Sequence, residues 1–314
     1  MVNRHCAHHY SLYPQPYLYN HENAALVGTI AALLAAICYG FIPFFTLPIK
    51  QGLPADFMSD PSILFYRFGF AALFIGLVML VRRQDFKVTR GELVTLIYLS
   101  FISDGSALFL IDGYNYMSSG VATTLHFMYP VVTALLMMTF YHEARRLSTI
   151  LAIIMSVAGV GVLCWDPTGH TSLQGIIIVL ISAVCYALYL IRVNRSRAAH
   201  MDSLKLVFYI LFIGALIFLA EALRQNSFQP ISSSLQFGNL VALALICTIV
   251  TNVCLVVSVK SIGSTMTAVI GALEPLTAVV VGCLVFHEAF TWQVLTGILL
   301  IIPAVVIIIW TRRR

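Results

Sequence analysis

Runs of about 20 apolar residues recur along most of the chain, and they constrain its fold more than any other feature. A run of this length crosses the hydrocarbon core of a bilayer as a single α-helix. Apolar residues make up 60% of the 314 residues and charged residues only 10%, whereas a soluble domain has about 25% charged residues. The runs lack the alternating pattern of a membrane barrel, so the sequence predicts an all-α membrane protein whose main solvent is lipid.

Ten transmembrane helices are expected, separated by residues that favour turns and helix ends. The predicted helices cover residues 25–48, 61–81, 92–115, 118–140, 148–165, 173–192, 203–223, 237–258, 264–286 and 292–311. Asp60 and Pro61 supply an N-cap and a proline at the first position of the second helix. We interpret the polar and aromatic residues 1–23 as a disordered cytoplasmic tail.

The lysines and arginines predict which connections face the cytoplasm. If the N-terminus is placed inside, the outer connections contain Lys50 and Arg224, Arg67 lies within a helix, and the rest of the 18 cationic residues are on the inner side. This bias predicts that both termini are cytoplasmic. It also accounts for the net charge of +5, so we expect no nucleic-acid partner. The seven cysteines lack zinc or redox spacing, so we expect no metal and no cofactor.

The sequence contains an internal repeat with a shift of about 145 residues. The matched segments are 36–40 with 183–187, 65–66 with 208–209, 129–130 with 274–275, and 142–144 with 287–289. We expect two five-helix repeats, at residues 24–166 and 173–312. Because five is odd, the second repeat must enter the membrane from the opposite side. This predicts two inverted five-helix repeats around a central cavity, an arrangement typical of alternating-access transporters.

The order and spacing of these segments resemble those of a known family. The segments are Gly28 with Ala36 to Gly40, Tyr66-Arg67-Phe68, Pro130 with His142-Glu143, Gly175 with Ala183 to Ala187, Lys260 to Gly263, Leu273-Glu274-Pro275, and His287-Glu288. Over residues 24–312 the chain resembles the EamA-type permeases of the drug/metabolite transporter superfamily. It has His-Glu where the family usually has a Leu-Gly-Glu ending. The resemblance implies ten helices around a central cavity and export of small metabolites, and it leaves the substrate open.

Ionisable residues at membrane depth are functional candidates, because they are costly there. Arg67 and Asp112 lie at similar depths near the outer ends of their helices. They either form an ion pair that closes the outer cavity, or Arg67 binds a substrate carboxylate. Asp104 and Glu274 lie near the middle of their helices, where each is either structural or binds substrate or a proton. Pro275 follows Glu274, and a proline at that place suggests a hinge or a cavity wall.

Further candidates lie on helix faces that we expect to line the cavity. His126 shares a face with Thr123 and Pro130, and its side chain either bonds between helices or handles protons. Tyr39 and Tyr186 occupy equivalent repeat positions, where they either pack or attract a cation with their rings. Other candidates are Tyr129 and Asn252 for the cavity and Pro130, with Pro275, for the hinge.

These residues predict a secondary active transporter that exports a small amphoteric metabolite, such as an amino acid or amine, across the cytoplasmic (inner) membrane of a bacterium. Energy would come from a proton gradient or from the substrate's own gradient. The alternative is a lipophilic-cation or drug exporter, which does not need Arg67. An integral-membrane enzyme would need a clustered polar site at one membrane face, and the sequence shows none. The expected partners are the small-molecule substrate and lipid, with proton coupling and a homodimer left open.

Overall fold

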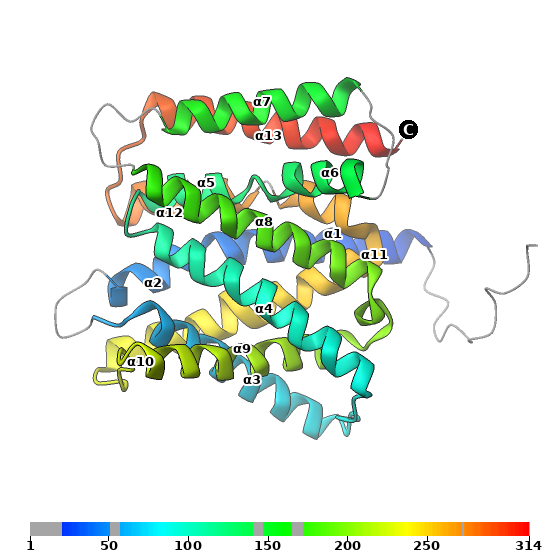
Figure 1. Ribbon diagram of the computed structural model, residues 1–314, viewed down its shortest axis with the longest axis vertical. Helices are drawn as coiled ribbons and strands as arrows, with labels where there is room; N and C mark the ends of the chain where they lie inside the picture. The colour runs from blue at the N-terminus through cyan, green and yellow to red at the C-terminus, as the bar shows by residue number, and fades with distance from the viewer. Residues whose placement is uncertain (1–20, 51–56, 141–146, 165–171, 272, 314) are drawn as a thin grey trace, which may run out of the picture.

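The computed structural model describes residues 21–50, 57–140, 147–164, 172–271 and 273–313, and its regular elements are helical throughout (Figure 1). In chain order they are α1 (His21–Gly40), α2 (Ile42–Lys50), α3 (Asp60–Val81), α4 (Arg90–Gly113), α5 (Ser119–His126), α6 (Tyr129–Phe140), α7 (Leu147–Cys164), α8 (Leu173–Arg195), η2 (Arg197–His200), α9 (Ser203–Arg224), α10 (Ser234–Ala244), η3 (Leu245–Val250), α11 (Thr251–Ile270), α12 (Leu273–Val285) and α13 (Trp292–Arg313). The all-α prediction is confirmed for this part of the chain. The predicted tail up to residue 20 and the first His-Glu pair, His142-Glu143, lie outside the described residues.

Seven stretches of the described chain are long and apolar enough to cross a bilayer. They are Ala25–Lys50, Asp60–Val81, Arg90–Gly113, Ser119–Phe140, Leu173–Val193, Ser203–Arg224 and Ser234–Gly263. Shorter apolar helices cover Leu273–Val285 and Trp292–Ala304. Large apolar side chains such as Leu73, Leu77 and Val81 of α3 are exposed on the outside of the bundle. Extensive exposed apolar surface suits contact with lipid, and the chain is a multi-pass membrane protein.

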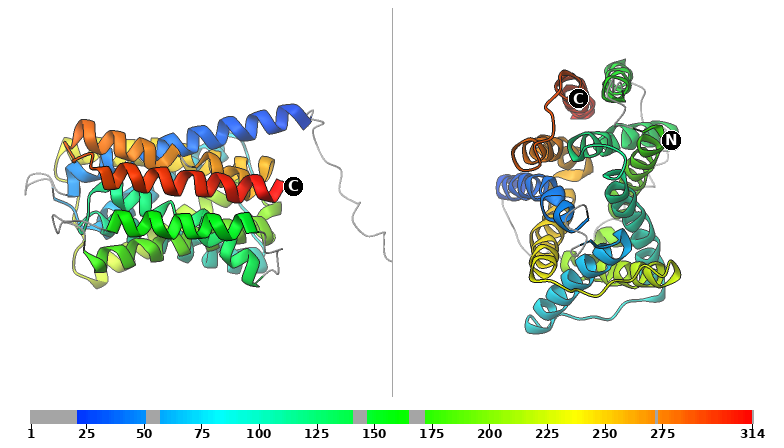
Figure 2. Two further views of the ribbon diagram at one scale, coloured as in Figure 1. Left: turned by 90° about the horizontal axis from the view of Figure 1, so that it is seen from above. Right: turned by 90° about the vertical axis from the view of Figure 1, so that its left-hand side faces the viewer.

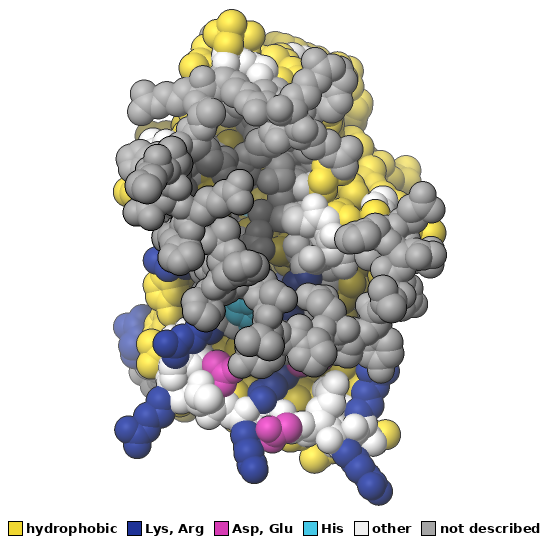
Figure 3. All heavy atoms as spheres, turned by 90° about the vertical axis from the view of Figure 1, so that its right-hand side faces the viewer, with side chains coloured by type: hydrophobic (Ala, Val, Ile, Leu, Met, Phe, Trp, Pro, Cys, Tyr) yellow, Lys and Arg dark blue, Asp and Glu magenta, His cyan; other side chains and the backbone are white. Residues whose placement is uncertain are grey.

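The helices lie side by side with their long axes in roughly one direction (Figures 1 and 2). The start of α1 and the end of α13 lie at the same end of the bundle, which is the end that faces the viewer in Figure 3. Lysine and arginine side chains gather on this end (Figure 3). The connection between α3 and α4 lies there and carries the exposed Arg82, Arg83 and Lys87.

Helices from the two halves of the chain pack against one another. α3 packs along α9, α5 against α12 and α7 along α13, while α1 lies along α11 and α4 along α8. Buried side chains from both halves form a continuous apolar core. Gly40 shows how close the approach is: a Cβ there would lie 2.8 Å from the carbonyl oxygen of Glu274. A side chain at this position would therefore push α12 away from α1.

Two of the predicted helices are interrupted in the middle of the bundle. The helix expected at 118–140 ends at His126 and begins again at Tyr129, because Pro130 has no N–H to donate to the His126 carbonyl. The helix expected at 264–286 is interrupted in the same way before Leu273, two residues ahead of Pro275. Both prolines thus lie in the first turn of a new helix, where a missing N–H costs little. The prediction of one continuous helix in each place is wrong.

The spans on either side of these breaks are also irregular. α1 and α2 are separated at Phe41, so the helix expected at 25–48 is divided. The expected boundary between 258 and 264 is a kink at Gly263, whose φ of +81° is a conformation that side chains rarely adopt. The helix expected at 237–258 contains η3, a π-helical segment. Irregular backbone at membrane depth is tolerated where it is buried in protein, and π-helical turns are frequent at functional sites.

Candidate functional site

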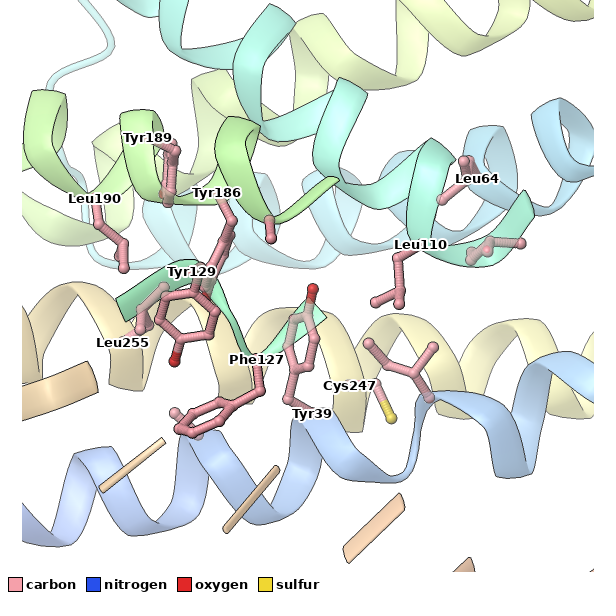
Figure 4. Packing of buried hydrophobic residues seen from close by; sticks show 14 of the residues in the cluster. Tyr39, Leu64, Leu110, Phe127, Tyr129, Tyr186, Tyr189, Leu190, Cys247 and Leu255 are labelled. Carbon is pink, nitrogen blue, oxygen red and sulfur yellow. The ribbon is translucent and has the colours of Figure 1, made fainter. Parts of the chain in front are cut away.

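Four buried aromatic side chains meet at the centre of the bundle, and we call them the aromatic cluster. They are Tyr39 of α1, His126 at the end of α5, Tyr129 at the start of α6 and Tyr186 of α8. The ring centroids of Tyr129 and Tyr186 are 4.6 Å apart, those of His126 and Tyr186 5.3 Å, and those of Tyr39 and His126 6.0 Å. Figure 4 shows the three tyrosines reaching this place from different helices. The break between α5 and α6 allows His126 and Tyr129 to face the same point.

A hydrogen-bond chain fixes the orientation of the His126 ring. The Ser182 hydroxyl donates to the Ser106 carbonyl oxygen at 2.7 Å, and it lies 2.9 Å from His126 Nδ1. Because the serine proton is used, His126 donates from Nδ1 and keeps an unprotonated Nε2 when neutral. In the described structure Nε2 is buried and has no hydrogen-bond partner. The aromatic cluster therefore contains a free acceptor nitrogen.

Glu274 brings a carboxyl group to the same place from the first turn of α12. The Tyr129 hydroxyl donates to Glu274 Oε1 at 3.5 Å. Glu274 Oε2 is buried and has no partner among the described residues. The break before Leu273 puts this carboxyl group at a helix start, inside the protein. A buried acceptor beside aromatic faces suits a cationic group such as an ammonium.

Arg67 of α3 is buried and is held by the π-helical segment η3. Its Nε donates to Thr248 Oγ1 at 2.7 Å and its Nη2 to the Cys247 carbonyl oxygen at 3.3 Å. Thr248 Oγ1 in turn donates to the carbonyl of Leu243, five residues earlier. The guanidinium has five N–H donors in a planar fork that matches a carboxylate. These two bonds leave donors for another group.

The expected ion pair between Arg67 and Asp112 is not formed. Asp112 instead accepts a hydrogen bond from Asn115 at 3.0 Å, at the C-terminal end of α4. A partly buried ion pair at this end joins Lys50 and Asp60. Lys50 was expected in a connection between helices, but it is the last residue of α2 and is buried. Arg67 belongs to neither ion pair of the described chain, the other being Arg224 with Glu221.

Tyr39 connects the two charged groups. It lies within electrostatic reach of both Glu274 and Arg67. Its ring stacks against His126 with an interplanar angle of 11°. A carboxyl acceptor and a guanidinium donor thus both lie near one aromatic ring, and all three side chains are buried.

The structure places the other sequence candidates around this site. Asn252 donates to the Thr248 carbonyl oxygen at 2.8 Å and so holds η3 in place. Thr123 is buried on α5 next to Tyr114. Asp104 lies on α4 against Gly214 of α9, apart from the aromatic cluster. Asp112 lies at the C-terminal end of α4.

Sequence reasoning missed several groups that support the site. They are Ser106, Ser182, Cys247, Thr248 and Tyr189. A serine or threonine in an apolar helix carries no signal of which way it faces. The π-helical geometry of η3 likewise leaves no mark in the apolar sequence Leu245–Val250.

The second His-Glu motif, His287-Glu288, is bonded to the start of α5. Glu288 Oε1 accepts from the Ser119 backbone N–H at 2.9 Å and from its hydroxyl at 2.7 Å, and Oε2 accepts from the Gly120 N–H at 3.3 Å. These groups form the N-terminus of α5, whose free N–H groups favour a carboxylate. Gly282 permits the approach, since a Cβ there would lie 2.3 Å from Glu288 Oε2.

A multi-pass helical bundle with interrupted helices, aromatic rings and ionisable groups at its buried centre is the architecture of a membrane transport protein. The chain matches the model of the EamA-like transporter family over residues 26–165 and again over 173–310. It therefore belongs to the EamA-like transporter family. The resemblance inferred from the sequence motifs is confirmed.

Two further similarities agree with this assignment. The chain is 26% identical over 200 residues to a protein of Bacillus subtilis (strain 168) named "Uncharacterized transporter YvbV". That alignment covers 62% of this chain and 65% of the relative, slightly less than two thirds of its length. A solved crystal structure aligns with a TM-score of 0.67 at 17% identity, over 93% of this chain and 98% of its own. At that identity the likeness concerns the fold alone.

Proposed function

We propose that this transporter is a secondary active carrier that exports a small amphoteric metabolite, such as an amino acid or amine, by alternating access. The observation that carries the proposal is that two buried groups of opposite charge, Glu274 and Arg67, both lie within electrostatic reach of Tyr39. Neither charged group has an oppositely charged partner in the described structure. A zwitterion supplies both missing charges at once. A polyanion or an apolar molecule would leave at least one of them buried and unpaired, which is costly.

In this proposal, Glu274 and His126 bind the ammonium group of the substrate, and Arg67 binds its carboxylate. The substrate ammonium would donate to Glu274 Oε2 and lie against the rings of the aromatic cluster. His126 Nε2, an acceptor, would bind a further N–H of the same ammonium. The substrate carboxylate would accept from the unused N–H groups of Arg67, in the two-point geometry that arginine favours. The side chain of the substrate would lie among the apolar residues of the core.

The packing of the helices supports ten spans in two inverted repeats, at 24–166 and 173–312. Three of the packed pairs, α3–α9, α5–α12 and α7–α13, join a helix to its equivalent in the other repeat. The other two pairs, α1–α11 and α8–α4, are equivalent to each other when the repeats are exchanged. A two-fold relation between the halves produces these pairings. The interruptions before Tyr129 and Leu273 fall at matched repeat positions. We propose that the prolines of these interruptions act as hinges when one half moves against the other.

The distribution of charge supports the orientation. The bundle end that carries the start of α1 and the end of α13 also carries the lysines and arginines seen in Figure 3. The positive-inside rule makes this end cytoplasmic. We propose the bacterial cytoplasmic membrane as the location, with both termini inside, and a proton or substrate gradient as the energy source.

Thermal stabilisation of the purified protein tests the substrate class, because a ligand that binds the folded state raises its stability. Phenylalanine is the zwitterionic probe, phenethylamine lacks its carboxylate, and N-acetylphenylalanine lacks its ammonium. We expect stabilisation by phenylalanine or other amino acids in the wild type, and weak or absent stabilisation by the two single-charge analogues. Equal stabilisation by phenethylamine and phenylalanine would refute the role of Arg67.

A second candidate is the export of lipophilic cations, which the four rings of the aromatic cluster and Glu274 favour. This substrate does not use Arg67. Tetraphenylphosphonium distinguishes the two candidates. If it stabilises the wild type and the Arg67→Met variant equally, and amino acids stabilise neither, the cation exporter is the correct reading.

A further inference from the structure

A second buried carboxyl group lies apart from the aromatic cluster, where α4 meets α9. Asp104 occupies the middle of α4, and only 3% of it is exposed. A Cβ on Gly214 of α9 would lie 2.6 Å from Asp104 Oδ1 and 2.7 Å from the ring of Phe68. Within the described residues neither carboxyl oxygen of Asp104 has a hydrogen-bond partner. This carboxyl group is therefore enclosed and unsatisfied.

The helices around Asp104 bring no counter-charge to it. α8 contributes the hydroxyl of Tyr189, which is buried and also lacks a hydrogen-bond partner in the described chain. Cys185, one turn earlier on α8, contacts α4 beside the aspartate. α9 presents Gly214, α3 presents Phe68, and the neighbouring Arg67 turns to η3. An ionised carboxylate would have no opposite charge here, at membrane depth, and it receives no hydrogen bond from the described residues.

A metal ion does not fit the same place. Hard cations such as Ca²⁺ take six or more oxygen ligands. The surroundings described above offer the two Asp104 oxygens and the Tyr189 hydroxyl. The described residues contain no group of three His, Cys, Asp or Glu side chains that could hold a metal ion. The close contact with Gly214 also leaves little volume, whereas a proton needs none.

We propose that Asp104 is a proton-binding site of this transporter, distinct from the substrate site at Glu274. The carboxylate takes up one proton and is neutral while α4 and α9 are packed together. It releases the proton when the two helices separate and water reaches it. α4 lies in the first family-matched segment and α9 in the second, so movement of one half against the other opens this interface.

The two sites are close enough to influence each other. The ring of Tyr189 stacks on Tyr186 of the aromatic cluster, with centroids 6.1 Å apart and an angle of 24°. Tyr186 packs on Tyr129, which bonds to Glu274. A shift of α8 thus moves groups at both sites. The role of Asp104 in coupling rests on the proposed function, whereas proton binding by Asp104 does not.

Infrared difference spectroscopy of the substrate-free, purified protein tests proton binding. At neutral pH we expect the wild type to show the C=O band of a protonated carboxyl group that Asp104→Asn lacks. The matched control Glu274→Gln keeps that band. Carboxylate bands in its place would show that Asp104 is ionised and would overturn the proposal. Asp104→Ser gives the same comparison if the asparagine variant does not fold.

Proteoliposomes test the coupling, with radiolabelled phenylalanine as probe. We expect Asp104→Asn to exchange phenylalanine across the membrane like the wild type. Its accumulation ratio under an imposed pH gradient should fall to about 1, because the two fluxes are no longer linked. Accumulation equal to the wild type would refute the coupling role. If the wild type itself does not exchange phenylalanine, the proposed substrate class is wrong, and the infrared result still decides proton binding.

Discussion

Two interfaces between the halves of the molecule each enclose one ionisable side chain, and these two side chains differ in their hydrogen bonding. Arg67 of α3 faces η3, where a threonine hydroxyl and a backbone carbonyl accept its hydrogen bonds. Asp104 of α4 faces α9, where Gly214 offers no side chain and no donor bonds to the carboxyl group. The surroundings of Arg67 stabilise a charged side chain, whereas those of Asp104 favour the neutral, protonated form.

The repeat makes this comparison a direct one. The residue of the second repeat that corresponds to Arg67 is Ile210, on α9. The Ile210 carbonyl oxygen accepts from Ser100 Oγ of α4 at 3.3 Å, one turn before Asp104. Related interfaces thus carry a cation in one copy and a carboxyl group in the other. In the mechanism we propose, the interface with the cation binds the substrate carboxylate and the interface with the carboxyl group binds a proton.

The largest expected effect comes from removing the charge in the first interface. Arg67→Met keeps the apolar stem and leaves Thr248 bonded to Leu243, so the fold should persist. Loss of a buried partner for the substrate carboxylate should weaken amino-acid binding by about 2–5 kcal/mol. Ligand-induced thermal stabilisation measures this. An unchanged shift in melting temperature with phenylalanine would contradict the assignment.

The infrared band of Asp104, measured in the same Arg67→Met variant, tests whether the two interfaces are independent. Arg67→Met should leave the infrared band assigned to Asp104 unchanged, because the arginine is committed to η3. A loss of that band would mean that the two interfaces share one electrostatic network.

The next largest effect is expected from a substitution that separates α4 from α9. Gly214→Ala puts a methyl group against Asp104 Oδ1 and the Phe68 ring, which should lower the free energy of unfolding by about 1–3 kcal/mol. Gly69→Ala is the control, because its Cβ would lie 4.0 Å from the nearest atom, on Ala215 across the α3–α9 contact. Combining Gly214→Ala with Asp104→Ala should recover part of the loss. Equal melting temperatures of Gly214→Ala and Gly69→Ala would show that α4 and α9 are packed less closely than the structure indicates.

The sequence predicts much of the fold because lipid imposes simple rules on it. The length of each apolar run shows where most spans lie, and the paired motifs relate Tyr129-Pro130 to Glu274-Pro275. The interruptions before Tyr129 and Leu273 were not foreseen. A proline is compatible with a kink or with a new helix start, and tertiary packing decides between them.

Several candidate residues lie close together in the structure, whereas their individual contacts differ from those considered in the sequence. Tyr39, His126, Tyr186 and Glu274 were candidates, and the structure brings them together. Of the two alternatives for Arg67, the ion pair with Asp112 is not formed, since depth along a helix does not say which way a side chain turns. The support from η3 depends on a π-helical turn that the sequence does not mark.

A carboxylate with three donors provides a counterpart to Asp104. Glu288 accepts from two N–H groups and a hydroxyl at the start of α5. Glu288→Gln removes the charge that this helix end favours and should lower the free energy of unfolding by about 1 kcal/mol. Asp104→Asn should cost less, because no hydrogen bond to the carboxyl group is lost. Thermal unfolding of both variants in one detergent checks the order, and the reverse order would contradict the surroundings assigned to the two groups.

The smallest effect tests whether η3 holds Arg67 in place. Asn252 donates to the Thr248 carbonyl oxygen, on the residue whose hydroxyl accepts from Arg67. Asn252→Ala removes one hydrogen bond, worth about 0.5–1.5 kcal/mol. Because the substrate carboxylate depends on the position of Arg67, amino-acid binding should weaken several-fold, while binding of tetraphenylphosphonium and the Asp104 band stay unchanged. Equal weakening for both ligands would show that Asn252 supports the whole bundle, and the contrast between the two interfaces would then not extend to η3.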